Sequence, residues 1–458
     1  DIIVLESQLP VPKSKEFKRL VQILIDKHLN DLKERASKTS TPDSSLFAIP
    51  KTLRENATSR LESHTWNTIS KISTACKALA TYYLFFPKSE EFTEELILDF
   101  TLNMMSSFIV DNDTKGNNLI APLNTEVGKK VVSVDYSPII DFLLGQLKNV
   151  NDNPNYKDDK FFYENSPLLK YFMAKLMAYS LINQPVCVSG PTGVGKTSSA
   201  RAFASMRPNS QGEYSTFKMH SFHAGTKTSQ FFGTTILTNG KIDFHDGTLT
   251  TALKEGEAFI ADEFNLSPQL VMKSIAPALE QTLDRKIFIP GIGQAINIAD
   301  GFFFIACQND LGTLGRNAIP ESIAHKFAYI SYPRPSLKDM QDICISISRE
   351  GYTDSAFYPH QDEAEKLAVF MDNLNKEAQG NPYVIPWSLR DIAKIFRRIR
   401  YQNLPENQGV FNQIDIRLNV FFYTMASIPQ SYQAIVMETI KSKFMLSFQI
   451  PEDQMDEI

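Results

Sequence analysis

The feature that most constrains the fold of this chain is the run Gly-Pro-Thr-Gly-Val-Gly-Lys-Thr at residues 190–197. It is the complete pattern of a phosphate-binding loop, in which glycines let successive backbone N–H groups turn toward phosphate oxygens. The apolar run at 185–188 predicts a short buried strand before the loop, and residues 198–206 predict a helix after it. A strand, a tight turn and a helix in this order predict an α/β fold that holds a nucleotide at the helix N-terminus.

The residue types in this loop predict separate tasks for its members. We expect Lys196 to reach the β- and γ-phosphates of ATP and Thr197 to bind Mg²⁺. The loop as a whole is expected to hold the nucleotide through Gly190, Pro191, Thr192, Gly193, Val194, Gly195, Lys196, Thr197 and Ser198. The alternative is a glycine-rich turn without a ligand, and the agreement of strand, loop and helix argues against it.

A second part of the site is predicted where four apolar residues, 258–261, are followed by two carboxylates. We expect Asp262 to hold the Mg²⁺ ion and Glu263 to act as the general base that activates the attacking water. Many strands end in a charged turn, so this pattern is weak by itself. It gains weight here because it follows a phosphate loop at the distance expected within one domain.

Further strands are predicted at 217–219 and 301–307, and Asn309 follows the second of them. Because residues 301–307 are almost continuously apolar, they are typical of a strand buried on both faces of a parallel sheet. Turn residues at Asn239-Gly240 and Pro290-Gly291 predict two inserted β-hairpins. Alternating strands and helices predict a doubly wound parallel sheet, with the active site at the carboxyl ends of its strands.

Apolar residues at helical spacing dominate both ends of the chain. Together with the strands and the phosphate loop between them, they predict four regions. A helix is also expected at 248–253, and a single helix at 268–280. The four regions are an all-helical region (1–110), a linker with one helix at 137–147 (111–162), an α/β nucleotide-binding domain (163–335) and a helical lid (336–458).

Equal spacings suggest an internal repeat. Trp66 and Trp387 lie as far apart in the sequence as Phe100 and Phe421, and as Met104 and Met425. One interpretation makes residues 1–110 the lid of a preceding module, which would dock against residues 165–335, with Ile69 in the place of Arg390. The other interpretation is that the matches are chance and the region is an independent helical domain.

Composition excludes several classes of function. The formal net charge of −5 implies no general attraction to nucleic acids or anionic membranes, and no apolar run reaches transmembrane length. The four cysteines form no C-x-x-C pair, which argues against a zinc site or a disulfide framework and predicts a reducing intracellular compartment, cytoplasm or nucleus. Since the first residue is Asp1, we expect the sequence to be a segment of a longer chain.

The residues from 165 to 400 resemble the AAA+ ATPases of the branch that holds midasin, dynein and the MoxR-like proteins. The resemblance rests on the phosphate loop, residues 240–256 and 262–268, Cys307-Gln308-Asn309-Asp310 and Leu314-Gly315-Arg316. It implies a P-loop AAA+ core with a helical lid, ATP and Mg²⁺ as cofactors, and neighbouring modules as partners in a ring.

The resemblance also implies roles for three more residues. Asn309 would be the first sensor of the γ-phosphate, and Arg390 the second sensor, reaching from the lid. Arg316 would be the finger that reaches a neighbouring module's nucleotide. Where the branch shows Asn-Arg-Phe, this chain has His325-Lys326-Phe327. Lys326 lacks the planar fork of arginine, so the position of the finger stays open between Arg316 and Lys326.

Two classes of function follow from the resemblance. In the first, the module hydrolyses ATP and drives conformational change in a ring that remodels a protein substrate or a macromolecular complex, as in ribosome biogenesis. In the second, it is a structural or regulatory module that binds ATP without hydrolysing it, as in a dynein-like motor or a mysterin-type giant ubiquitin ligase. Neither class implies direct binding to nucleic acid or membrane.

Overall fold

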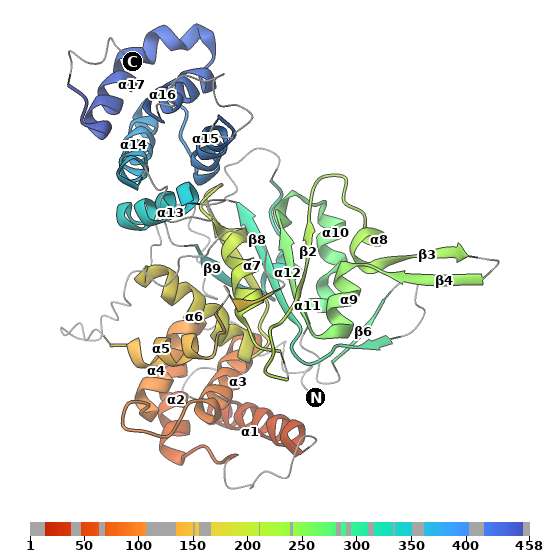
Figure 1. Ribbon diagram of the computed structural model, residues 1–458. Coiled ribbons are helices and arrows are strands. Elements are labelled where there is room, and N and C mark those ends of the chain that lie inside the picture. Colours follow the sequence, from red (N-terminus) through yellow and green to blue (C-terminus); the bar gives the residue numbers. More distant parts are fainter. Residues whose placement is uncertain are drawn as a thin grey trace. The chain divides into compact units, whose positions relative to one another are not determined.

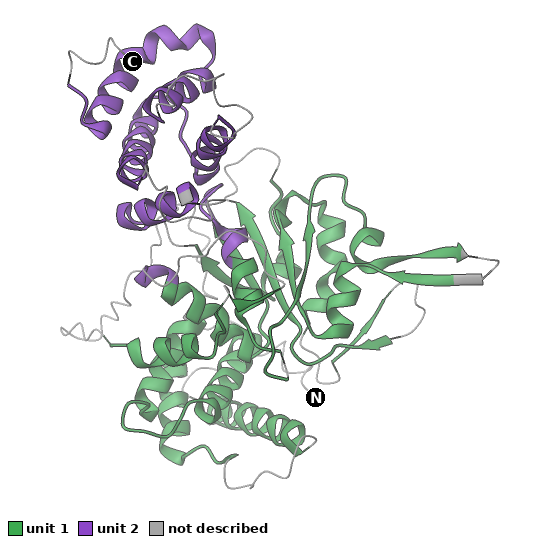
Figure 2. Cartoon of the chain, in the orientation of Figure 1, with its two compact units in different colours: residues 1–155, 170–189, 200–332 green, residues 156–169, 190–199, 333–458 purple. Residues whose placement is uncertain are grey.

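The computed structural model describes residues 14–37, 47–63, 69–106, 134–149, 152–154, 166–209, 211–238, 241–280, 285–289, 295–309, 316–332, 335–349, 361–402 and 416–451. The chain divides into two compact units (Figure 2). The first unit comprises residues 1–155, 170–189 and 200–332, and the second comprises residues 156–169, 190–199 and 333–458. In the described part of the chain, no helix has both the length and the apolar character that crossing a membrane requires.

The core of the first unit is a five-stranded parallel sheet with the strand order β2-β5-β8-β1-β9 (Figure 1). Its strands are β1 (Val186–Gly190), β2 (Phe217–Ser221), β5 (Ala258–Asp262), β8 (Phe303–Asn309) and β9 (Ala328–Ser331). Six of the seven residues of β8 are buried, as expected for a strand covered on both faces. The predicted parallel sheet is therefore confirmed.

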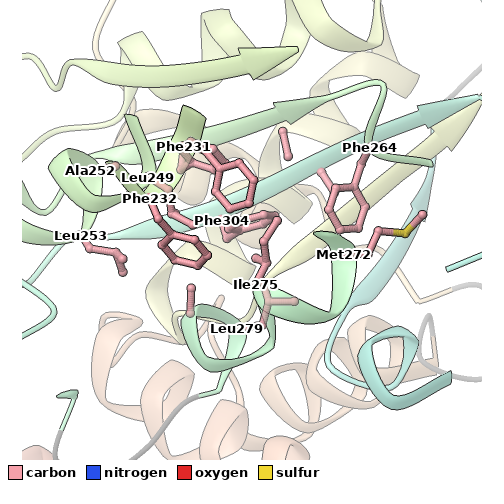
Figure 3. Close-up of a cluster of buried hydrophobic side chains, with 14 of the residues drawn as sticks. Phe231, Phe232, Leu249, Ala252, Leu253, Phe264, Met272, Ile275, Leu279 and Phe304 are labelled. Atoms are coloured by element: carbon pink, nitrogen blue, oxygen red, sulfur yellow. The ribbon is translucent and has the colours of Figure 1, made fainter. Parts of the chain in front are cut away.

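An aromatic and aliphatic cluster packs helices against one part of this sheet (Figure 3). The helices are α8 (Thr228–Phe232), α9 (Thr248–Glu255), α10 (Gln269–Ser274) and α11 (Ala276–Leu279). Phe304 of β8 and Phe264, which follows β5, lie in the same cluster and are at most 1% exposed. Burying one such side chain stabilises the fold by about 1.5–3 kcal/mol, so this cluster fixes the ends of the strands that carry the acidic residues.

Two helix boundaries differ from the prediction. The single helix expected at 268–280 is wrong, because the chain forms α10 and α11 with Ile275 between them. Pro277 occupies one of the first two positions of α11, where its missing N–H costs nothing, whereas inside one long helix it would clash with the preceding turn. The helix after the phosphate loop, α7 (Lys196–Met206), begins two residues before the expected Ser198.

Both predicted hairpins are present. β3 (Gly233–Thr238) pairs antiparallel with β4 (Lys241–Asp246), and β6 (Lys286–Phe288) pairs with β7 (Ala295–Asn297). Figure 1 shows β3 and β4 extending away from the sheet. The expected turns at Asn239-Gly240 and Pro290-Gly291 lie outside the described residues.

The N-terminal helices pack against α6 (Pro167–Leu181). They are α1 (Lys15–Ser37), α2 (Lys51–Ser63), α3 (Ile69–Phe85), α4 (Glu94–Ser106) and α5 (Ser137–Gly145). The hydroxyl of Tyr82 donates to the carbonyl of Ala178 at 3.0 Å, and that of Tyr179 donates to the carbonyl of Met104 at 2.6 Å. The domain boundaries expected from the sequence stay predictions.

The proposed internal repeat also stays a prediction. Trp66 lies outside the described residues, while the two other pairs of equal spacing fall on α4 and on α16 (Ile416–Ser427). The neighbouring packing differs, because α1 packs mainly against α3, whereas α13 (Leu337–Arg349) packs mainly against α14 (Gln361–Gly380).

The second unit contains the helical lid that the sequence predicted. It has α13, α14 and α16, together with α15 (Leu389–Gln402) and α17 (Gln430–Phe448). The buried residues of α15 are Ile392, Ile395, Phe396 and Ile399. Their spacing of three and four places them on one face of the helix, and this face packs into the lid core that also holds Trp387 and Phe444.

Candidate functional site

The phosphate loop begins where β1 ends and runs directly into α7. Gly193 has φ of 76° and Gly195 has φ of 102°, in the region that glycine adopts at little cost and other residues avoid. The N–H of Ser199 donates to the carbonyl of Gly195 at 2.9 Å, which is the first bond of the helix. The positive end of α7 therefore follows the loop immediately, and this is the arrangement that binds phosphate in proteins.

Lys196 lies inside this loop. The residue is 6% exposed, and its ammonium group donates to the carbonyl of Gly190 at 2.8 Å and to that of Pro191 at 2.5 Å. A buried charge is costly unless it is paired or hydrogen-bonded, so the two carbonyls hold the ammonium in place. Because charged phosphate oxygens are stronger acceptors for an ammonium group than carbonyl oxygens are, a bound phosphate could replace these carbonyls as the partner of Lys196.

The start of α15 touches the phosphate loop within the second unit. A Cβ atom placed on Gly193 would lie 2.5 Å from the Cβ of Ser388 and 3.0 Å from its hydroxyl oxygen. Only a residue without a side chain fits between this loop and Ser388. Arg390 lies two residues further along the chain, exposed in the first turn of α15.

Asp391 stabilises this end of α15. Its carboxylate accepts hydrogen bonds from the N–H of Ser388 at 2.9 Å, from the Ser388 hydroxyl at 2.8 Å and from the Tyr423 hydroxyl at 2.8 Å. Burial alone would raise the pKa of Asp391, but these hydrogen bonds favour the carboxylate and lower the pKa below its usual value. The position of Ser388 against the loop thus depends on an ionised aspartate.

The acidic pair lies at the carboxyl end of β5, in the first unit. Asp262 is the last residue of the strand and stands opposite Ser221 of β2. Glu263 follows with φ of 53°, in the left-handed region. For a residue other than glycine this conformation costs about 1–3 kcal/mol and persists only when neighbouring contacts hold it. The carbonyl of Glu263 accepts from the N–H of Leu266 at 2.8 Å, which closes a tight turn.

Two side chains hold the Glu263 carboxylate: Asn309, the last residue of β8, and Arg316, which follows that strand in the sequence. The amide nitrogen of Asn309 donates to both carboxylate oxygens, at 3.1 and 2.9 Å. Arg316 forms an ion pair with one of the same oxygens. The side chain of Arg316 is 8% exposed and that of Glu263 is 24% exposed, so the pair is largely shielded from water.

Asn265 connects Asn309 with Arg316 through hydrogen bonds of its side chain. It is fully buried, its amide donates to the carbonyl of Asn309 at 2.8 Å, and its oxygen accepts from Arg316 at 3.3 Å. Its backbone carbonyl accepts from the N–H of Asn317 at 2.8 Å. Glu263, Asn309, Arg316 and Asn265 therefore form one connected polar network.

Comparison with known proteins identifies the part of the chain that carries these residues. Residues 185–327 match the family model described as "AAA domain (dynein-related subfamily)". This part of the chain is an AAA+ module of the dynein-related branch. The match confirms the AAA+ branch that the resemblance in the sequence implied.

The AAA module is similar to parts of much longer proteins. Midasin of Dictyostelium discoideum is 26% identical over 170 residues, which are 36% of this chain and 3% of that protein. Midasin of Giardia intestinalis is 28% identical over 174 residues, again 36% of this chain and 3% of that protein. Among solved structures, NtrX from Brucella abortus in complex with ADP is 14% identical, covers 64% of each chain and has a TM-score of 0.39.

Two residues of the AAA module carry oxygen groups of the kind that bind Mg²⁺. Thr197 offers a hydroxyl and Asp262 a carboxylate, and Mg²⁺ is usually held by one or two such oxygen ligands together with substrate phosphates. Among the described residues, no group of three or more His, Cys, Asp or Glu side chains lies close enough together to hold a metal ion. The four cysteines are all free and buried.

Some of the predicted site residues contact one another in the structure, and others have different partners from those expected. Glu263, Asn309 and Arg316 meet in one network, although Arg316 was expected to reach a neighbouring module. Lys326, the other candidate for the finger, forms an ion pair with Glu280 at 2.9 Å near the surface. Asn265 was not predicted, and its position between the acidic pair and Pro268 is the only signal in the sequence that could have suggested it.

Proposed function

We propose that this AAA module binds ATP with Mg²⁺, hydrolyses it, and passes the resulting change to its helical lid and to neighbouring modules of a larger ring. One observation carries the hydrolytic part of the proposal. Glu263 follows β5 and Asn309 ends β8, so both lie at the carboxyl edge of the parallel sheet. Strand β1 of the same sheet leads directly into the phosphate loop. In open α/β sheets, ligands bind at this edge, where the strand order reverses.

Each residue has a role that follows from its chemistry. Lys196 would neutralise the β- and γ-phosphates, and Thr197 and Asp262 would hold the magnesium ion, which offsets phosphate charge when bound. Glu263 would take a proton from the attacking water as the new bond from water oxygen to the γ-phosphorus forms and the bond to the bridging oxygen breaks. Asn309 would orient that water, and Arg390 would reach the phosphates from the lid.

The contact between Gly193 and Ser388 supports the coupling to the lid. Since no side chain fits between the loop and α15, a phosphate that shifts the loop also displaces the start of α15. The similarity to midasin supports the further proposal that such modules act in a ring on a protein substrate or a macromolecular complex. The ring partners would be AAA modules of the same chain or of another.

Two variants test the proposal. Lys196→Ala removes the charge that faces the phosphates, so binding of a fluorescent ATP analogue should be lost. Glu263→Gln keeps the shape of the side chain and removes the base, so the analogue should still bind while turnover stops. Arg54→Met, which removes a partly buried arginine of α2 that is paired with Asp26, is the matched control for both measurements.

Micromolar binding of the analogue by Lys196→Ala would contradict the nucleotide assignment. Unchanged turnover by Glu263→Gln in an assembly that hydrolyses ATP would remove Glu263 from the mechanism and leave binding intact.

A second function is favoured by the state of Glu263. Because its carboxylate is bonded to Asn309 and Arg316, the module could hold ATP without hydrolysing it, as a structural module of a dynein-like or mysterin-type protein would. Nucleotide that stays bound through purification, without turnover in the complete assembly, would select this function over the first.

A further inference from the structure

We propose that Arg316 acts within its own module as a positioning residue that holds the carboxylate of Glu263 on Asn309, away from the attacking water, until a phosphate group displaces it. This inference rests on the proposed role of Glu263 as the general base. It assigns Arg316 a task that differs from the finger role expected from the sequence.

The contacts at Glu263 occupy lone pairs of the carboxylate that a general base would direct at water. A general base needs an oxygen lone pair directed at the proton that it will accept. One carboxylate oxygen accepts from both Asn309 and Arg316, and the other accepts from Asn309 at 3.1 Å. The same contacts engage the amide of Asn309, which is proposed to orient the water. Two groups that should face the water therefore face each other.

Arg316 is built into the module, which argues against a side chain that reaches outward. Its guanidinium bonds to Asn265, whose carbonyl accepts from the next residue, Asn317. The amide of Asn317 donates to the carbonyl of Ser267 at 3.0 Å. Residues 316 and 317 are thus tied to the turn that follows β5, and a finger for another module would have to break these bonds.

Two features of this network favour its release. The buried Nε atom of Arg316 finds no hydrogen-bond partner among the described residues, so only part of the guanidinium fork is used. Glu263 itself is held in a left-handed conformation that a residue with a side chain rarely adopts. A phosphate group presents several charged oxygens that match the fork of an arginine, and it can satisfy the donor that Glu263 leaves unpaired.

The test compares steady-state ATP turnover of the full chain and its variants at several chain concentrations, together with the affinity for a fluorescent ATP analogue. Arg316→Met should raise kcat by about tenfold, the effect of losing one charge-assisted hydrogen bond to the base, and should leave KM and analogue affinity unchanged. Arg316→Lys keeps the charge without the planar fork of the guanidinium, so its kcat should lie between that of the unaltered chain and that of Arg316→Met. The increase should not depend on chain concentration, because Arg316 acts on its own module.

Two further variants separate the explanations. Glu263→Gln combined with Arg316→Met should show no turnover, since the gain must pass through Glu263. Arg54→Met should behave as the unaltered chain. If Arg316→Met unfolds, Arg316→Lys alone decides the matter by the sign of its change in kcat.

The possible outcomes are distinguishable. A lower kcat for both Arg316 variants would overturn the inference, and a loss that grows with chain concentration would make Arg316 a finger for a neighbour. A weaker analogue affinity together with lower thermal stability would reduce Arg316 to a structural residue. If the unaltered chain binds no ATP analogue, the proposed function fails and the inference fails with it.

Discussion

Replacing Gly193 by alanine tests whether the phosphate loop and the lid helix α15 are in direct contact. Two penalties are expected. The left-handed φ of 76° costs about 1–2 kcal/mol for a residue with a Cβ atom, and the new methyl group would lie 2.5 Å from the Cβ of Ser388. Overpacking of this kind costs about 1–3 kcal/mol. We therefore expect Gly193→Ala to lower the free energy of unfolding of the lid by about 2–5 kcal/mol, the sum of these two ranges.

Gly212 provides a matched control. It has the same φ of 76°, but no atom lies within 4 Å of the position that its Cβ would take. Gly212→Ala should therefore show the backbone penalty alone, and the difference between the two variants measures the contact with Ser388. Ser388→Gly should restore most of that difference, because glycine at a helix N-terminus costs only a few tenths of a kcal/mol.

Urea unfolding can measure these differences, with circular dichroism following the first unit, which holds Gly212, and tryptophan fluorescence following the second unit, which holds Gly193. The chain has two tryptophans, so a Trp66→Phe background leaves Trp387, the residue next to Ser388, as the only reporter. Equal losses for Gly193→Ala and Gly212→Ala would refute the contact. A full loss that Ser388→Gly does not relieve would show that the backbone conformation, and not the lid, makes glycine necessary at this position.

Two other predictions follow from buried polar groups. Asn265→Ala should lower the free energy of unfolding of the first unit by about 1–3 kcal/mol, because it removes the side-chain donor to the buried Asn309 carbonyl and one of the two acceptors of Arg316. Urea unfolding followed by circular dichroism measures this loss, and a change near zero would contradict the network. Because its folded-state pKa is lowered, Asp391 should stabilise the lid above its ordinary pKa of 3.8 and lose that contribution as the pH falls through the lowered value. Trp387 fluorescence during acid unfolding should show this loss in the unaltered chain, and a similar profile in Asp391→Asn would contradict it.

Local patterns were sufficient to predict much of the fold. The continuous apolar run that became β8 predicted a strand buried on both faces, and the alternation of strands with helices predicted the parallel sheet. Turn residues predicted both hairpins. The failure at 268–280 has a local cause as well, because Pro277 was included in a continuous helix although a proline there interrupts the hydrogen-bond ladder.

The candidate site was predictable only as a set of residue types. The spacing of a phosphate loop and an acidic pair predicts the roles of Lys196 and Glu263, since each role depends on chemistry that the side chain carries by itself. The contact of Gly193 with Ser388 joins residues far apart in the sequence, and no local pattern records it. The same holds for Arg316, whose ion pair with Glu263 joins residues 53 positions apart in the sequence.

Glu263 shows why a site can depart from the conformation that its sequence favours. A glutamate gains nothing locally from a left-handed backbone, so the cost must be met by contacts that the turn makes possible. In this chain those contacts are the hydrogen bonds from Asn309 and the ion pair with Arg316, both to the same carboxylate. If these contacts hold the turn, then weakening the ion pair both frees the base and lowers the stability of its turn. A rise in turnover for Arg316→Met should therefore be accompanied by a small loss of stability confined to the first unit, while Arg54→Met should produce no rise in turnover.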